Sequence, residues 1–148
     1  MQEPLLIGWR EWVSLPQLGL ISIKAKIDTG ARSSSLHVTA LETFERDGQT
    51  WLRFAVAPRR RSARTVPCEA PALERRAVTD SGGRTAERWF IRSAIVLDGA
   101  RIDADINLTD RGGMLFPMLI GRTALHGRFR VDPDLSWVCG RRKRGASV

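Results

Sequence analysis

Residues 21–31 read Ile21-Ser22-Ile23-Lys24-Ala25-Lys26-Ile27-Asp28-Thr29-Gly30-Ala31. The strict alternation of apolar and polar residues over its first seven positions predicts a β-strand with one buried face. The glycine that follows predicts a tight turn at the end of that strand. The pattern therefore places the carboxylate of Asp28 at the point where a strand stops.

A second segment complements the first one almost ninety positions later. Pro117-Met118-Leu119-Ile120-Gly121-Arg122 reads as an apolar strand that ends in glycine, and Thr123-Ala124-Leu125 continues it with a helical pattern. The sequence predicts one short helix here, over Arg122–Gly127. No other part of the chain carries a comparable helical pattern.

Together the two segments resemble the retropepsin signature. With their flanks they resemble, more narrowly, the retropepsin-like family labelled "ATP-dependent zinc protease", the RimB-like aspartic peptidases associated with RimK-type glutamate ligases. The likeness extends from about Ile7 to Asp132. The segments that carry it are Ile7–Val13, Lys26–His37, Val78–Gly83 and Met118–Arg122.

Most of the chain alternates with period two, and glycine turns such as Asp47-Gly48 and Asp98-Gly99 separate the alternating runs. These features predict an all-β fold. The resemblance implies a closed, retropepsin-like acid-protease barrel with the short helix after Gly121. Strands are expected at Leu18–Ile27, Leu36–Phe44, Trp51–Ala57, Arg88–Leu97, Arg101–Leu108 and Leu115–Ile120.

The length of 148 residues fits one domain that can bury its own core. We assign residues 1–140 to the peptidase domain and 141–148 to a basic, flexible C-terminal tail. Cys68 and Cys139 are too few for a disulfide framework and are expected to be buried or half-buried thiols. Without a leader pattern or a run of roughly 18 apolar residues, the chain is expected to be soluble and cytoplasmic, with no membrane partner.

The formal net charge of +8 is concentrated in two basic runs, Arg141–Arg144 and Arg59–Arg61 with Arg64. Such runs attract anions nonspecifically through screened Coulomb forces. No RNA-binding motif accompanies them, so we expect no nucleic-acid partner beyond nonspecific contact through the tail.

Peptide hydrolysis by carboxylates needs two of them, which share a proton and a water molecule. The resemblance gives one such residue per chain, Asp28. A catalytic dyad then requires a homodimer that brings two copies of Asp28 together across a two-fold axis.

Asp80-Ser81-Gly82 is a rival within the same chain, because it also spells Asp-Ser/Thr-Gly. A pepsin-like pair would need a longer chain and a second apolar strand ending in glycine, and only Leu119-Ile120-Gly121 fits that role. We interpret Val78–Phe90 as containing a flap whose tip residues Ser81, Gly82 and Gly83 approach substrate. An ordinary surface hairpin is the alternative.

The retropepsin resemblance also implies roles for individual residues. Thr29 is expected to hydrogen-bond the loop of the partner copy, Gly30 to permit the tight turn beside substrate, and Ala31 to keep the floor of the site small. Gly121 is expected to let its strand pack against the Asp28 loop. An Asp-Thr-Gly turn in an unrelated β protein is the alternative reading.

One pair of positions departs from viral retropepsins, where an aspartate after the motif pairs with the later arginine. Here both positions are arginine, Arg32 and Arg122. Two guanidinium groups near a cleft repel each other unless an anion joins them. Either Asp132 compensates or substrate carboxylates do, and we hypothesise that Arg32 and Arg122 line the substrate site and that Arg32 selects acidic peptides.

His37 and His126 are the only histidines, and neither lies in a His-Glu-x-x-His pattern. No Gly-x-x-x-x-Gly-Lys-Ser/Thr loop for ATP is present. We therefore expect no cofactor and no metal site. The principal hypothesis is a homodimeric aspartic endopeptidase that processes glutamate-rich tails; the alternatives are a non-catalytic peptide-binding adaptor of the ligase system and a zinc-dependent peptidase.

Overall fold

The computed structural model describes residues 3–58, 64–80, 82–110 and 116–140. Most of these residues form β-strands, and among them are a 3₁₀ turn at Pro16–Leu18 and one α-helix, α1 (Arg122–Leu125). The strands are β1 (Leu5–Ile7), β2 (Arg10–Leu15), β3 (Leu20–Asp28), β4 (Ser34–His37), β5 (Thr39–Arg46), β6 (Gln49–Val56), β7 (Val66–Pro71), β8 (Glu74–Thr79), β9 (Thr85–Leu97), β10 (Ala100–Thr109), β11 (Met118–Gly121) and β12 (Phe129–Val131). The all-β prediction is confirmed.

The largest sheet has seven strands in the order β10-β4-β11-β3-β2-β9-β8. Strand β3 lies inside it, antiparallel to β2 and parallel to β11. Its alternation buries Ile23, Ala25 and Ile27 on one face, as the sequence predicts. Burying an isoleucine side chain contributes about 1.5–3 kcal/mol, so Ile23 and Ile27 fix which face of β3 turns to the core.

Strand β9 pairs with β10 as well as with β8, over the register from Leu97↔Ala100 to Phe90↔Asn107. Strand β9 is therefore also paired with β10, the strand that stands at the opposite end of the strand order. The finer prediction of a closed retropepsin-like barrel stays a prediction and is taken up with the proposed function.

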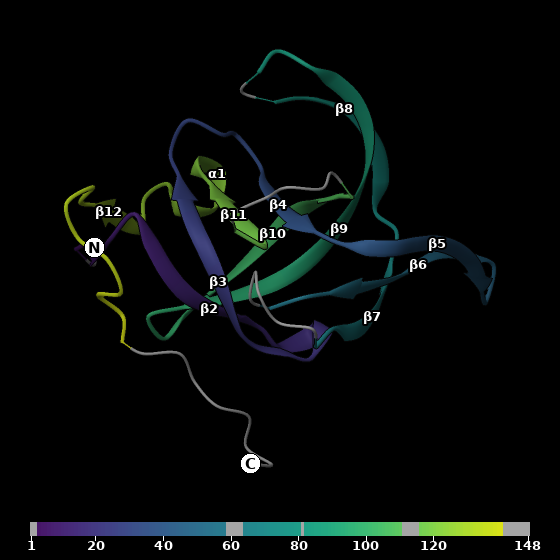
Figure 1. Cartoon of the computed structure of the whole chain (residues 1–148), viewed down its shortest axis with the longest axis horizontal. Helices are drawn as coiled ribbons and strands as arrows, with labels where there is room; N and C mark the ends of the chain where they lie inside the picture. Colours follow the sequence, from purple (N-terminus) through teal and green to yellow (C-terminus); the bar gives the residue numbers. More distant parts are fainter. Residues whose placement is uncertain (1–2, 59–63, 81, 111–115, 141–148) are drawn as a thin grey trace.

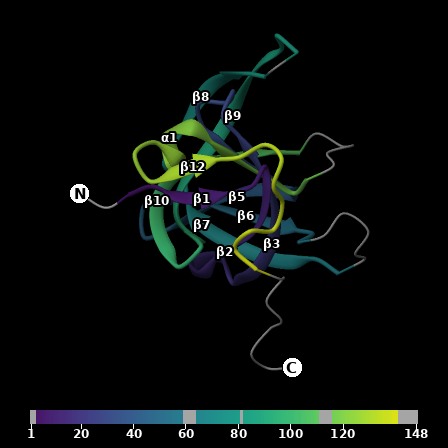
Figure 2. The ribbon, with the colours of Figure 1, turned by 90° about the vertical axis from the view of Figure 1, so that its left-hand side faces the viewer.

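The β5–β6 hairpin extends from this body (Figure 1) and belongs to a separate three-stranded sheet with β7. The β8–β9 hairpin arches away from the body in both views (Figures 1 and 2). Asp80 directly follows Thr79, which forms the last pair of this hairpin with Thr85. Sequence analysis placed a flap or a surface hairpin in this region, and the structure has a hairpin there.

The two ends of the described chain lie side by side, because β1 pairs in parallel with β12. Glu11, which is fully buried, holds the segment that follows β12: its carboxylate accepts hydrogen bonds from the backbone amides of Gly8, Val138 and Cys139 at 2.7, 3.0 and 3.1 Å. A buried carboxylate requires such donors, and here they fasten the C-terminal segment across β2.

Strand boundaries differ from the prediction where the backbone leaves the alternating conformation. The predicted strand Leu36–Phe44 is two strands, β4 and β5, which separate at Val38. The amide of Val38 donates to the carbonyl of Thr109, and Ala40 adopts a positive φ of 54°. The chain thus leaves one sheet and enters another. The sequence analysis missed β1, β7, β8 and β12, and the predicted helix is shorter, ending at Leu125.

Strand β2 lies inside the large sheet, where it pairs with β3 along its length and with β9 at Ser14↔Val96. Two of its side chains, Arg10 and Trp12, contact tryptophan rings. Trp12 stacks on Trp137 with ring centroids 5.2 Å apart, and the Arg10 guanidinium lies 4.7 Å from the ring of Trp9 and 5.0 Å from that of Trp137.

Residues 141–148, the predicted basic tail, and Arg59–Arg61 lie outside the described residues. Among the described residues no helix is long and apolar enough to cross a bilayer. The expected cytoplasmic location stays a prediction.

Candidate functional site

Asp28 is the last residue of β3, and its register partner on the parallel strand β11 is Gly121. The half-buried carboxylate accepts a hydrogen bond from the amide of Gly30 at 3.1 Å, and the carbonyl of Asp28 accepts one from Ala31 at 3.2 Å. The two predicted motifs are therefore neighbours in space, joined by β-sheet pairing. The turn fixes where the carboxylate emerges from the strand.

Gly121 is in close contact with the loop that follows Asp28. A Cβ atom at this position would lie 2.5 Å from the carbonyl oxygen of Ser33 and 2.9 Å from that of Arg32. Real Cβ atoms do not approach backbone so closely. Glycine is therefore required by the packing of β11 against this loop, as the sequence analysis expected.

Backbone and side-chain hydrogen bonds tie the same loop to the start of α1. The amide of Arg122 donates to the carbonyl of Ala31 at 2.8 Å, and the Thr123 hydroxyl donates to the carbonyl of Arg32 at 2.7 Å. The amide of Gly121 donates to the hydroxyl of Ser34 at 3.1 Å. The residues after Asp28 are thus held on one side by β11 and α1.

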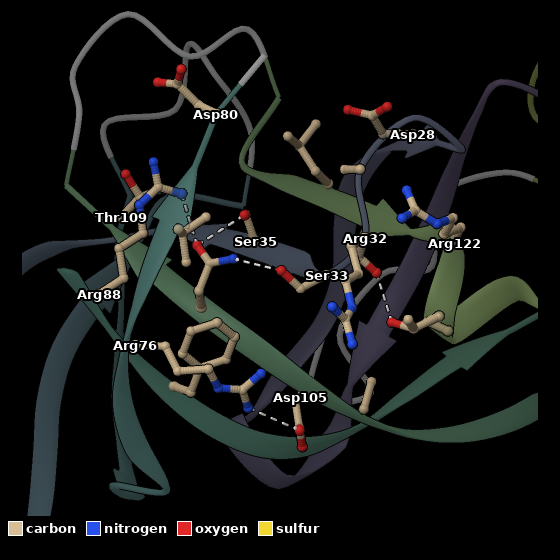
Figure 3. A pocket seen from close by; sticks show the side chains of 18 of the residues that line it. Asp28, Arg32, Ser33, Ser35, Arg76, Asp80, Arg88, Asp105, Thr109 and Arg122 are labelled. Carbon is tan, nitrogen blue, oxygen red and sulfur yellow. Dashed lines mark hydrogen bonds and ion pairs between the residues drawn. The ribbon is translucent and has the colours of Figure 1, made fainter. Parts of the chain in front are cut away.

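A cleft of about 1200 Å³ opens between this loop, the β8–β9 hairpin and β10 (Figure 3). Asp28 and Asp80 both line it. Its other charged lining residues are five arginines and two aspartates: Arg32, Arg76, Arg88, Arg92, Arg122, Asp103 and Asp105. The volume and open shape suit a peptide segment.

Asp80 has the same local geometry as Asp28. Its carboxylate accepts hydrogen bonds from the amides of Gly82 at 2.9 Å and Arg84 at 3.0 Å, and Gly83 donates to its carbonyl. Gly83 adopts a positive φ of 83°, the left-handed conformation that glycine favours. Ser81, predicted to bind substrate, lies outside the described residues. Gly82 and Gly83 are exposed at the tip of the hairpin and do not line the cleft.

Asn107, which sequence analysis missed, connects three elements behind the cleft. This residue is 1% exposed. Its side-chain oxygen accepts hydrogen bonds from the Ser35 hydroxyl at 2.9 Å and the Arg88 guanidinium at 3.0 Å. Its amide nitrogen donates to the carbonyl of Ser34 at 2.9 Å and to the hydroxyl of Ser33 at 3.4 Å. The only sequence signal was one polar residue within the apolar run Ile106–Leu108.

Arg32 and Arg122 both line the cleft, as predicted, and point in different directions (Figure 3). Arg122 donates to the carbonyl of Gly30 at 3.3 Å. Asp132, proposed as a compensating acid, accepts a hydrogen bond from the amide of Asp134 instead. Within the described part of the chain it forms no ion pair with either arginine. That alternative is not supported.

Thr29 is exposed, and the structure gives its hydroxyl no hydrogen bond among the described residues. Ala31 and Gly30 line the cleft beside Asp28. The predicted roles of these three residues toward substrate or a partner copy therefore rest on their positions and stay predictions.

The two histidines and two cysteines do not gather at one site. His37 ends β4 with a buried Nδ1 that has no hydrogen-bond partner among the described residues, while His126 is exposed after α1. Burial raises the pKa of the Cys68 thiol to about 11, and burial together with the charge of Glu11 raises that of Cys139 to about 12. Both thiols are thus protonated at neutral pH. In the described ranges no three His, Cys, Asp or Glu side chains gather as a metal site would need.

The comparison with family models decides the family. The model described as "Retropepsin-like aspartic endopeptidase RimB" matches residues 6–142. The chain belongs to the RimB-like family. The family resemblance stated from the sequence is confirmed, and the match covers every element that builds the cleft of this RimB-like chain.

Curated relatives of the RimB-like chain carry a different name, "Probable alpha-L-glutamate ligase". The relative from Desulfotalea psychrophila is 40% identical over 136 residues, which cover 91% of this chain and 29% of the relative. Relatives from Shewanella pealeana and Parasynechococcus marenigrum are 37% and 40% identical and are covered over 30% of their length. The chain therefore spans less than a third of these relatives.

A solved structure with a similar fold is that of Lpg0085, a protein of unknown function from Legionella pneumophila. It superposes with a TM-score of 0.76 at 28% sequence identity, over 93% of this chain and 99% of the other. The RimB-like chain thus shares its arrangement of strands with a protein of nearly equal extent.

Proposed function

We propose that this RimB-like chain is a homodimeric aspartic endopeptidase in which Asp28 of each subunit contributes one carboxylate to a catalytic dyad. The observation that carries the proposal is the register of Asp28 against Gly121, at the rim of a cleft wide enough for a peptide. The return of the pairing from β9 to β10 supports a closed, retropepsin-like barrel beneath that cleft.

The chemistry follows from two carboxylates held close together. Two such groups cannot both ionise at low cost, so they share one proton. A water molecule attacks the scissile carbonyl while the ionised carboxylate takes a proton from this water. The protonated carboxyl group donates its proton to the carbonyl oxygen. Thr29 is exposed and its hydroxyl has no partner among the described residues, which is compatible with the contact to the loop of a second copy that we propose.

Acidic peptides are the substrate class that we propose. Arg32 lines the cleft, and among the described residues its guanidinium has no acidic partner. An arginine facing a cleft binds a carboxylate through charge-assisted hydrogen bonds. Since the curated relatives are named as glutamate ligases, glutamate-rich tails made by a RimK-type ligase are the substrate that we would test first.

The alternative is a peptide-binding adaptor of the ligase system. Its supporting observation is that the named ligases contain a region similar to this chain within a protein more than three times as long. An adaptor would bind glutamate-rich peptides in the same cleft without cleaving them.

The deciding experiment is cleavage of a glutamate-tailed peptide by the wild-type protein and by Asp28→Asn, each with and without a strong zinc chelator. Activity that is lost in the variant and indifferent to the chelator supports the aspartic peptidase. Chelator-sensitive activity that survives in Asp28→Asn would establish a zinc-dependent peptidase. Binding without cleavage by the wild-type protein would favour the adaptor.

A further inference from the structure

Arg76 and Arg88 lie directly opposite each other at the base of the β8–β9 hairpin. Their register is part of the antiparallel ladder that also pairs Val78 with Ala86 and Thr79 with Thr85. Both arginines line the cleft. Directly opposed like charges destabilise an antiparallel pair, so this arrangement works against the stability of the hairpin.

Elsewhere in the same protein opposed strands place opposite charges together. In the three-stranded sheet of β5, β6 and β7, Arg53 is in register with Glu42 on one side and with Glu69 on the other. It forms ion pairs with these two residues at 3.1 and 2.9 Å. Arg10 and Lys26, opposed between β2 and β3, are another pair of like charges in register, but neither lines the cleft. What distinguishes the opposed arginines of the β8–β9 hairpin is that both line the cleft.

Neighbouring residues hold each of the two arginines in place. Arg76 pairs with Glu74 at 2.6 Å and with Asp105 at 3.3 Å, and its guanidinium lies 4.0 Å from the ring centroid of Phe90. Arg88 is half-buried and donates to the side-chain oxygen of buried Asn107 at 3.0 Å. Figure 3 shows the two side chains turned apart, Arg76 toward Asp105 and Arg88 toward the Thr109 side of the cleft. The guanidinium groups are thus preorganised at two separate places.

An extended peptide can present side chains to both places. Side chains at positions i and i+2 of a strand point to the same side and are separated by about 6.5–7 Å. A peptide lying along the base of the hairpin would present alternate side chains to Arg76 and Arg88. Guanidinium groups fixed in advance bind carboxylates at a lower entropic cost than mobile ones do.

We propose that Arg76 and Arg88 form a subsite for acidic side chains of the peptide at the base of the β8–β9 hairpin, with Arg88 as its principal residue. The ligand class in this inference, acidic peptides, is taken from the proposed function. The subsite is additional to Arg32, for which we propose the same kind of contact. The protein then recognises acidic residues from two sides of the cleft, from the loop after Asp28 and from the hairpin. Asn107 acts as a positioning residue, because it bonds to Arg88 and to Ser33–Ser35.

The test separates binding from cleavage by using the full-length protein in an Asp28→Asn background. Calorimetry measures the affinity for a peptide that ends in four glutamates and for its counterpart that ends in four glutamines. Arg88→Gln is expected to lower the glutamate-to-glutamine affinity ratio by about tenfold, the size of one charge-assisted hydrogen bond, and Arg76→Gln by about threefold. Arg88→Lys, which keeps the charge, should restore part of the ratio.

Arg75→Gln is the matched control. Arg75 is next to Arg76 on β8, but it points to the other face, where it pairs with Glu87 and stacks on Trp89, and it does not line the cleft. The control removes the same net charge, so an equal effect in Arg75→Gln would mean general electrostatic attraction and overturn the subsite. Thermal unfolding of each variant verifies that it is folded.

Several results would overturn the proposal. One is an unchanged affinity ratio in the Arg76→Gln/Arg88→Gln double variant or in both single variants. Another is a parent protein that binds both peptides equally. If the wild-type protein cleaves neither peptide while the affinity ratio responds as expected, the peptidase proposal fails and the subsite stands.

Discussion

Two Asp-Ser/Thr-Gly turns in this protein have nearly the same local structure and very different surroundings. In each turn the aspartate carboxylate accepts a hydrogen bond from the glycine two residues later, at 3.1 Å for Asp28 and 2.9 Å for Asp80. Asp28 ends an interior strand and faces Gly121 across a parallel pair. Asp80 lies at the tip of a hairpin that projects from the body.

The difference shows that the Asp-Ser/Thr-Gly motif determines only the local geometry of the turn. The second motif, the apolar strand that ends in Gly121, determines where the turn lies in the fold. Both sequences form the same turn because an aspartate side chain readily caps the amide two residues on. Within the described part of the chain, the Asp28 turn is backed by β11, α1 and the network around Asn107. Rigid support of this kind is what a catalytic group requires.

Asp28→Asn is the change with the largest expected effect. It preserves the shape of the turn and removes the group that gives and takes protons, so the rate of peptide cleavage should fall by about a thousandfold. The measurement is kcat on a glutamate-tailed peptide, with size-exclusion chromatography to verify that the variant assembles like the wild type. Undiminished cleavage would remove Asp28 from the mechanism.

Gly121→Ala tests the support behind the Asp28 turn. Its Cβ would meet the carbonyl of Ser33 at 2.5 Å, and we expect a loss of about 3 kcal/mol in the free energy of unfolding, the upper part of the range for overpacking. Urea denaturation at fixed protein concentration measures it. Gly82→Ala is the matched control from the other turn, because its Cβ would come no nearer than 3.4 Å to another residue. Equal losses in both variants would contradict the comparison.

Asn107→Ala tests the network behind the cleft. The substitution leaves the buried carbonyl of Ser34 without its donor, so we expect the free energy of unfolding to fall by about 2 kcal/mol. Ser35→Ala, which removes one bond of the same network, should cost less, about 1 kcal/mol. If the two urea midpoints shift equally, the network contributes no more than this single bond.

Asp80→Asn should have the smallest effect. Asparagine keeps the side-chain oxygen that accepts from Gly82 and Arg84, so the hairpin tip should stay folded and kcat/KM should change by less than about threefold. The same peptide assay serves as the readout. A loss as large as that of Asp28→Asn would instead favour an intrachain pair of the pepsin type.

The sequence was most informative where local pattern and long-range contact agree. The alternation in Ile21–Ile27 predicts β3, and the apolar run before Gly121 predicts β11, because each pattern reflects burial in the sheet. The break between β4 and β5 was not predictable, because Leu36-His37-Val38-Thr39 continues the alternation of apolar and polar residues. Val38 leaves the strand through a hydrogen bond to distant Thr109.

The sequence analysis placed segments on two sides of the cleft, the loop after Asp28 and the hairpin within Val78–Phe90, but it did not find all of the side chains that line it. Sequence analysis found the loop after Asp28, since its motif is contiguous, and it also selected Arg32 and Arg122. It did not find Arg76, Arg88 or Asn107, because their common location depends on strand register. Arg76 and Arg88 look like ordinary polar positions of two strands until β8 and β9 are paired.

The pairing of Asp28 with Gly121 joins positions that are far apart in the chain, and this separation affects the order of folding. A ribosome synthesises β3 long before β11, and contacts between such distant segments form late, because a large loop must close first. A nascent chain that ends before β11 carries the Asp28 turn without its support. The Asp28 turn therefore gains the support of β11 only near the completion of this domain.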